Sequence, residues 1–136
     1  MIIGFTGTRG EITHQQRAKL SELLTSLDGK ILCHGDAIGA DAEAHDLARQ
    51  KNYVIHIHPC TLEDQRAFRE ADVEYQPKEP LDRNKDIVSK CNVLLAIPKG
   101  FNEEQRSGTW QSIRYARIRK RKTHIIFPDG TVRVEN

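Results

Sequence analysis

The stretch "LCHGDAIGADAEAHDLA", residues 32–48, joins a short apolar run to a helical pattern. The apolar run ends at His34, and the turn that follows contains Gly35, Asp36, Gly39 and Asp41. A buried strand that passes through a glycine-rich turn into a helix is the repeating unit of a parallel α/β sheet. This stretch therefore predicts a strand and a helix, with polar groups gathered between them.

The same alternation of apolar runs and helical patterns continues along the whole chain. Short runs rich in β-branched residues predict five strands, "MIIGF", "KILC", "YVIHIH", "NVLLAIP" and "THIIF". Helices are expected after a capping Thr13 and over residues 38–50, 81–90 and 107–121. The tail "FPDGTVRVEN" has an Asp-Gly turn and predicts an edge hairpin. We predict one domain over residues 1–136, an α/β, Rossmann-like three-layer fold with a mostly parallel sheet of about five strands.

Composition narrows the class of protein. The 136 residues are 38% hydrophobic and 29% charged, which is typical of a globular domain and excludes a disordered chain. No apolar run is long enough to cross a bilayer, and the sequence starts with a strand-like "MIIGF" in place of a leader, so we expect a cytoplasmic protein. The three cysteines lack CxxC spacing, which argues against a disulfide framework or a zinc site.

Polar loops follow three of the predicted strands. They are "GFTGTRG", "CHGDAIGAD" and the segment from Pro98 to Gly108. In an open parallel sheet, ligands bind outside the carboxyl ends of the strands, where such loops meet and the following helices present their N-termini. We therefore expect all three loops on one rim of the molecule.

The first loop suits an anion. The spacing of Gly4, Gly7 and Gly10 matches neither the dinucleotide fingerprint nor a P-loop. It still lets the backbone approach a phosphate closely, beside the Thr8 hydroxyl and the Arg9 guanidinium. The alternative is a glycine-rich turn with a solvated arginine.

The segment "SGTW" is the stronger phosphate candidate. Ser107, Gly108 and Thr109 lie where the last predicted helix begins, so free amides, a hydroxyl and the positive end of the helix dipole occur together. Arg106 precedes them. The alternative is that Ser107 or Thr109 is only an N-cap, although a cap and a phosphate can share a helix start.

The acids of the second loop suit a sugar. A carboxylate accepts hydrogen bonds from ribose hydroxyls and repels phosphate, so we predict that Asp36 binds the sugar. Asp41 lies in the first helical turn, where the dipole alone favours an acid. His34, Asp36 and Asp41 match no standard metal motif, and we predict no metal or cofactor.

A cationic run forms the second half of the last predicted helix. Residues 114–122 contain six cations and no acid, namely Arg114, Arg117, Arg119, Lys120, Arg121 and Lys122. A basic helix end complements the helix dipole, but six cations exceed that need. Contact with single-stranded nucleic acid or an acidic partner is therefore an alternative function.

Four ordered motifs resemble one known family. "GFTGTRG", "CHGDAIGAD", "PLDRNKDIVSKCNVLLAIP" and "SGTWQSIRYAR" together resemble the SLOG superfamily, a Rossmann-like group that includes the LOG phosphoribohydrolases, DprA and small YspA/YpsA-like proteins. The resemblance covers about residues 2–128. It implies a nucleotide or nucleotide-derived ligand at Gly7, Thr8, Arg9, Gly35, Asp36, Arg83, Asn84, Ser107, Gly108 and Thr109. The same loops add His34, Gly39, Asp41, Pro98 and Arg106 to the predicted site.

The resemblance implies three functions. The first is binding of a nucleotide or phosphoribosyl-containing small molecule, as a sensor or handler of a nucleotide metabolite. The second is LOG-like N-glycosidase activity with Asp36 as the catalytic carboxylate; the glutamate of the LOG motif "PGGxGTxxE" is replaced here by Ser112, and Glu103 or Glu104 is a candidate substitute. The third is DprA-like binding of single-stranded DNA. Dimers are usual among these relatives, so we expect a homodimer.

Overall fold

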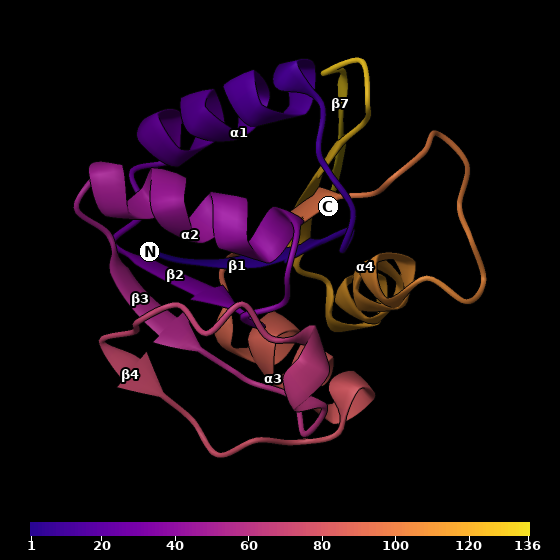
Figure 1. Cartoon of the computed structure of the whole chain (residues 1–136). Coiled ribbons are helices and arrows are strands. Elements are labelled where there is room, and N and C mark those ends of the chain that lie inside the picture. The colour runs from indigo at the N-terminus through magenta and orange to yellow at the C-terminus, as the bar shows by residue number, and fades with distance from the viewer.

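Strands and helices alternate along the chain in the computed structural model, which covers residues 1–136 (Figure 1). The elements are β1 (Ile2–Gly7), α1 (His14–Ser26), β2 (Ile31–His34), α2 (Ala40–Gln50), β3 (Val54–Ile57), the 3₁₀ turn η1 (Glu63–Gln65), β4 (Val73–Glu74), α3 (Pro80–Lys90), β5 (Val93–Ile97), α4 (Gly108–Arg119), β6 (Lys122–Ile126) and β7 (Val132–Glu135). None of the helices is both long and apolar enough to cross a membrane.

All seven strands belong to one sheet in the order β4-β3-β2-β1-β5-β6-β7. Every pairing is parallel except that of β6 with β7, which is the predicted hairpin. The α/β fold class is therefore confirmed, with two strands more than the five apolar runs. The unpredicted strand β4 is only two residues long, and both of them are exposed, so it carries no apolar pattern. Asp72 aligns it from outside the strand, because its carboxylate accepts hydrogen bonds from the Ile55 amide and Arg49.

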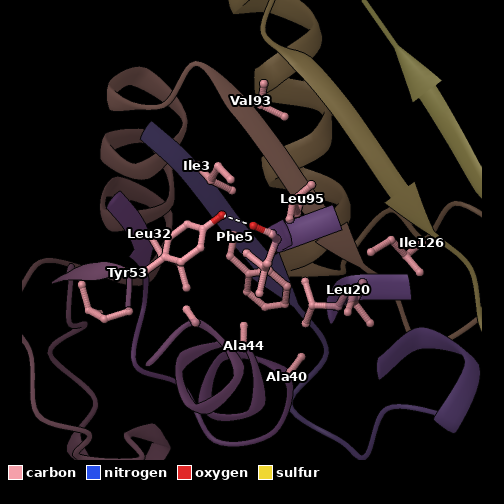
Figure 2. Packing of buried hydrophobic residues seen from close by; sticks show 14 of the residues in the cluster. Ile3, Phe5, Leu20, Leu32, Ala40, Ala44, Tyr53, Val93, Leu95 and Ile126 are labelled. Atoms are coloured by element: carbon pink, nitrogen blue, oxygen red, sulfur yellow. Dashed lines mark hydrogen bonds between the residues drawn. The ribbon is translucent and has the colours of Figure 1, made fainter. Parts of the chain in front are cut away.

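Helices cover both faces of the sheet. Figure 1 shows α1 and α2 on one face and α3 and α4 on the other. The larger core lies under α1 and α2, where Phe5, Leu20 and Leu95 are fully buried (Figure 2). Tyr53 closes one end of this core, and its hydroxyl donates to the Leu24 carbonyl. Trp110 is buried in a smaller cluster beneath α4.

Helix boundaries follow local chemistry. Thr13 caps α1 as predicted, and it forms a capping box with Gln16. Helix α2 begins at Ala40, two residues after the predicted start, because Gly39 has φ of 87° and cannot belong to a right-handed helix. Helix α4 ends at Arg119 and not at Arg121, because Lys120 takes the left-handed conformation that ends many helices.

The chain changes direction across the sheet between β1 and β5. After β1 the strands progress outward through β2 and β3 to β4, and β5 then returns to pair with the other edge of β1. Open α/β sheets bind ligands at such a switch point, beyond the carboxyl ends of the strands. Figure 1 shows the long loop between β5 and α4 beside this point.

Candidate functional site

A cleft of about 800 Å³ lies at the switch point. The loops after β1, β2 and β5, the start of α3 and the start of α4 form its walls. The lining residues are Phe5, Thr6, Gly7, Thr8, Arg9, Gly10, Gly35, Ala37, Asp41, Gln65, Pro80, Arg83, Asn84, Ile87, Lys99, Glu104, Gln105, Arg106, Ser107, Gly108 and Thr109. The three polar loops thus meet on one rim, as the strand order requires.

Most of the predicted site residues line this cleft. They are Gly7, Thr8, Arg9, Gly35, Asp41, Arg83, Asn84, Arg106, Ser107, Gly108 and Thr109. The other four, His34, Asp36, Gly39 and Pro98, lie outside it.

Arg83 is the buried cation of the cleft. It projects from α3, and only 8% of its surface is exposed. Its Nη1 donates to the carbonyls of Gly35, at 2.6 Å, and His58, at 3.2 Å. Its Nε has no hydrogen-bond partner, and no carboxylate forms an ion pair with the guanidinium. A buried cation without an ion-pair partner is costly, so its position at a cleft favours an anionic ligand.

Three glycines allow the cleft walls to approach one another. A Cβ on Gly35 would lie 2.2 Å from Arg83 Nη1, so the guanidinium packs directly on the glycine backbone. A Cβ on Gly39 would lie 2.5 Å from the Arg9 carbonyl carbon, and one on Gly7 would lie 2.5 Å from the Ala40 Cβ. The Thr8 carbonyl also accepts from the Ala40 amide at 2.9 Å. The first loop is therefore fixed against the start of α2.

The arginines of the cleft differ from most others in the chain. Seven of the twelve form ion pairs with carboxylates, namely Arg17, Arg49, Arg66, Arg69, Arg114, Arg117 and Arg133. Of the remaining five, Arg121 donates to backbone carbonyls and Arg119 contacts the Tyr115 hydroxyl. The other three, Arg9, Arg83 and Arg106, all line the cleft. Three of the five arginines without a carboxylate partner thus line the cleft, and the other two lie at or just after the end of α4.

The start of α4 adds hydrogen-bond donors. Ser107 is the N-cap, and its hydroxyl accepts from the Trp110 amide at 3.2 Å. The amides of Gly108 and Thr109 make no hydrogen bond within the protein. Two free amides at the positive end of a 12-residue helix, facing the same cleft as three arginines, can bind an oxyanion. Ser107 is therefore a cap, and the neighbouring amides remain available for a ligand.

Asp41 is the buried acid of the cleft. Its Oδ2 accepts from the amides of Gly35, at 3.1 Å, and Ala37, at 3.0 Å. Its Oδ1 makes no hydrogen bond within the protein, and Asp41 lines the cleft. Burial raises the pKa of Asp41 to about 6, while the nearby Arg83 guanidinium acts in the opposite direction. This carboxyl group titrates near neutrality within reach of a ligand.

Asp36 does not fit the sugar-binding and catalytic role that the sequence suggested. It is fully buried in a left-handed conformation, with φ of 57°. Its Oδ2 accepts from Arg66 Nε at 2.9 Å, and its Oδ1 accepts from the Arg69 amide at 3.0 Å. Both oxygens are therefore occupied in fixing the segment after η1. The N-glycosidase alternative loses the carboxylate that was assigned to it.

His34, Gly39 and Pro98 also have structural roles. His34 is fully buried, and its Nδ1 accepts from the Asp36 amide, so the proton must be on Nε2, which donates to His45 at 2.9 Å. Burial holds the pKa of His34 well below its ordinary value, with a smaller effect from His45. Gly39 packs on the Arg9 backbone, and the Pro98 carbonyl accepts from Gln16 at 3.0 Å.

Several lining residues lay outside the predicted site. Gln65 reaches the cleft from η1, because the Ile38 amide donates to its carbonyl at 3.0 Å. No sequence pattern signals that contact. Lys99 and Glu104 come from the loop after β5 and pair with each other at 3.6 Å. The length and charge of that loop were the sequence features that could have indicated these two residues.

Two of the six cations at the basic end of α4, Arg114 and Arg117, pair with carboxylates. Arg114 pairs with Glu103 at 2.9 Å and donates to the Gln105 carbonyl at 2.8 Å. Arg117 pairs with Glu103 at 3.1 Å and with Glu135 at 2.8 Å. These two arginines hold the cleft loop and the last strand against α4, which reduces the cationic surface available to nucleic acid. No group of three or more side chains suited to a metal ion is present in the chain.

The chain has a Rossmann-like α/β fold with a polar cleft at the switch point of its sheet. Three solved structures have a similar fold. The chain is similar to a molybdenum cofactor binding protein from the phototrophic bacterium Rippkaea orientalis, with a TM-score of 0.71 and 19% identity over 91% of this chain and 74% of the other. It is also similar to the Moco carrier protein from Chlamydomonas reinhardtii, with a TM-score of 0.64 and 22% identity over 91% and 74%.

A third similar structure is the DNA processing protein A (DprA) from Streptococcus pneumoniae. The TM-score is 0.68 with 19% identity, and the match covers 90% of this chain but 49% of that one. No protein-family model matches the sequence, and no curated protein matches it. Identities this low establish the fold, and the ligand must be argued from the cleft.

Proposed function

We propose that the protein binds a phosphate-bearing small molecule, a nucleotide or another phosphoribosyl compound, in the cleft at the switch point. The single observation that carries the proposal is the placement of Arg9, Arg83 and Arg106 in one cleft without acidic partners. The free amides of Gly108 and Thr109 face the same space. Arginine and helix-start amides together favour a phosphate over a neutral ligand.

The two cofactor-binding neighbours are compatible with this proposal. Their names describe binding of molybdenum cofactor, which is a small molecule. The cleft described here has the volume of a small-molecule site. We therefore favour a small ligand over single-stranded DNA, for which the engaged arginines of α4 leave less free charge.

A thermal-shift series followed by titration calorimetry tests the proposal. AMP, ADP-ribose, a cyclic dinucleotide, inorganic pyrophosphate and, as the control without phosphate, adenosine are each added to the intact protein. A ligand that binds only the folded state raises the melting temperature, and a concentration of a hundred times Kd stabilises by about 2.7 kcal/mol. We expect at least one phosphate compound to bind and adenosine to fail. Equal binding of adenosine and AMP, or no binding of any phosphate compound, would contradict the proposal.

A further inference from the structure

The cleft contains one acid, Asp41, that forms no ion pair. Asp41 and Glu104 are its only acidic lining residues, and Glu104 pairs with Lys99 on the same loop. Asp41 forms no ion pair within 4 Å, and two backbone amides fix its Oδ2. The free Oδ1 lies in a cleft that otherwise presents donors. A ligand there meets cations and amides together with one fixed acceptor.

A carboxylate in an anion site repels the anion itself. It is useful only if the ligand also carries a hydrogen-bond donor close to its anionic group. Asp41 and Arg83 both contact the Gly35 backbone, Asp41 Oδ2 at the amide and Arg83 Nη1 at the carbonyl. Asp41 and Arg83 can therefore contact neighbouring groups of one ligand.

The lining offers no platform for a nucleobase. Phe5 is the only aromatic residue among it, and its side chain is fully buried in the core. The other hydrophobic lining residues are small or aliphatic. Proteins that bind single-stranded nucleic acid stack the bases on exposed aromatic rings, and this cleft has none. The walls of this cleft suit a strongly polar ligand.

We infer that the unit recognised in this cleft is a sugar phosphate, with its phosphate on Arg83 and a sugar hydroxyl donating to Asp41 Oδ1, and that any attached base contributes little. The inference rests on the proposed function and specifies which part of the ligand is recognised. Asp41 is then a specificity-determining residue. It distinguishes a phosphorylated sugar from inorganic phosphate, which has no such hydroxyl beside its charge.

Titration of the wild-type protein gives the first test. Ribose 5-phosphate, AMP, adenosine and inorganic phosphate are compared by calorimetry at one salt concentration. We expect ribose 5-phosphate to bind within about tenfold of AMP and more tightly than inorganic phosphate, since stacking adds little here. If AMP binds and ribose 5-phosphate does not, the inference is wrong while the proposed function stands. If no phosphate compound binds, both are wrong.

The variant Asp41→Asn gives the second test. An asparagine can keep its oxygen on the Gly35 and Ala37 amides, and its amide group then presents a donor where Oδ1 accepted. Affinity for ribose 5-phosphate should fall on the order of tenfold or more, whereas affinity for inorganic phosphate should hold or rise. A parallel change in both affinities would show that Asp41 acts through charge or folding alone, and would overturn the inference.

Asp36→Asn is the matched control. Asp36 lies in the same loop and is buried, but its oxygens contact Arg66 and the Arg69 amide and not the cleft. This variant should lower the melting temperature and leave the ratio of the two affinities unchanged. A change in that ratio equal to the change in Asp41→Asn would also contradict the inference.

Discussion

Two regions of the molecule are rich in arginine, and they differ in what the guanidinium groups contact. At the end of α4, Arg114 and Arg117 share Glu103, and Arg121 donates to the Ser89 carbonyl. In the cleft, Arg83 and Arg106 have no carboxylate partner. Sequence alone made both regions candidates for anion binding. Ion pairs within the fold therefore distinguish Arg114 and Arg117 from the arginines of the cleft.

The largest effect is expected from Arg83→Gln. This change removes the buried charge of the cleft, and loss of one partner from a desolvated charge pair typically costs 2–5 kcal/mol, so AMP affinity should fall by about a hundredfold or more. Arg117→Gln is the matched control, because Arg117 is equally cationic but is paired with Glu103 and Glu135. Calorimetry on both variants checks the contrast. Comparable losses in the two variants would remove the distinction between the regions.

The next effect is expected from Gly35→Ala. A methyl group at this position would lie 2.2 Å from Arg83 Nη1, so the guanidinium must move away from its two carbonyl partners. We expect AMP affinity to fall roughly tenfold and unfolding stability to fall by about 1–3 kcal/mol. Gly100→Ala is the control in the cleft loop, since nothing lies within 4 Å of its added Cβ. A Gly35→Ala protein that binds AMP normally would show that the position of Arg83 is unimportant.

A smaller effect is expected from Arg114→Gln. This variant tests whether the ion pairs at the end of α4 help to hold the cleft loop in place. Arg114 holds Glu103 and the Gln105 carbonyl immediately before Arg106 in the cleft wall. Loosening that loop should weaken AMP binding about fivefold, because ordering it again on binding costs conformational entropy. The double variant with Arg106→Gln should bind no worse than Arg106→Gln alone. Arg119→Gln, on the same helix but away from the loop, should bind as wild type.

The smallest effect is a pH dependence of sulfate binding. Since burial raises the pKa of Asp41 to about 6, lowering the pH neutralises a carboxylate in the empty cleft while Arg83 stays charged. Burial lowers the pKa of His58 to about 4 and holds the pKa of His34 well below its ordinary value, so both histidines remain neutral in this range. Between about pH 7.5 and about pH 5.5, sulfate affinity should rise roughly threefold, and Asp41→Asn should abolish the change. A rise that persists in the variant would assign the titration to another group.

Most of the fold could be predicted from the sequence because its strands are buried, so that hydrophobic periodicity marks them. The predicted hairpin and the Thr13 cap are confirmed as well, because each depends on residues that are close together in the sequence. The strand β4 could not be predicted, since the Asp72 carboxylate and not its own residues sets its place beside β3.

The site was less completely predictable from the sequence than the fold. Loop composition predicted that Arg9, Asp36 and Thr109 would share a rim, and the strand order does bring their three loops together. It could not distinguish Asp36 from Asp41, two acids five positions apart in one loop. A left-handed residue at Asp36 turns that side chain toward Arg66, and only the second acid remains in the cleft. Backbone conformation at one residue therefore decided which carboxylate faces a ligand.

The central claim is that unpaired arginines in the cleft, and not the cationic helix end, bind an anion. Nuclear magnetic resonance of the arginine Nε–H groups during titration with inorganic pyrophosphate tests it directly, because each guanidinium reports on its own contacts. The account predicts saturable shifts at Arg9, Arg83 and Arg106, with Arg114, Arg117 and Arg121 unchanged. Shifts confined to the α4 arginines, or no shift at Arg83 at saturating pyrophosphate, would contradict it.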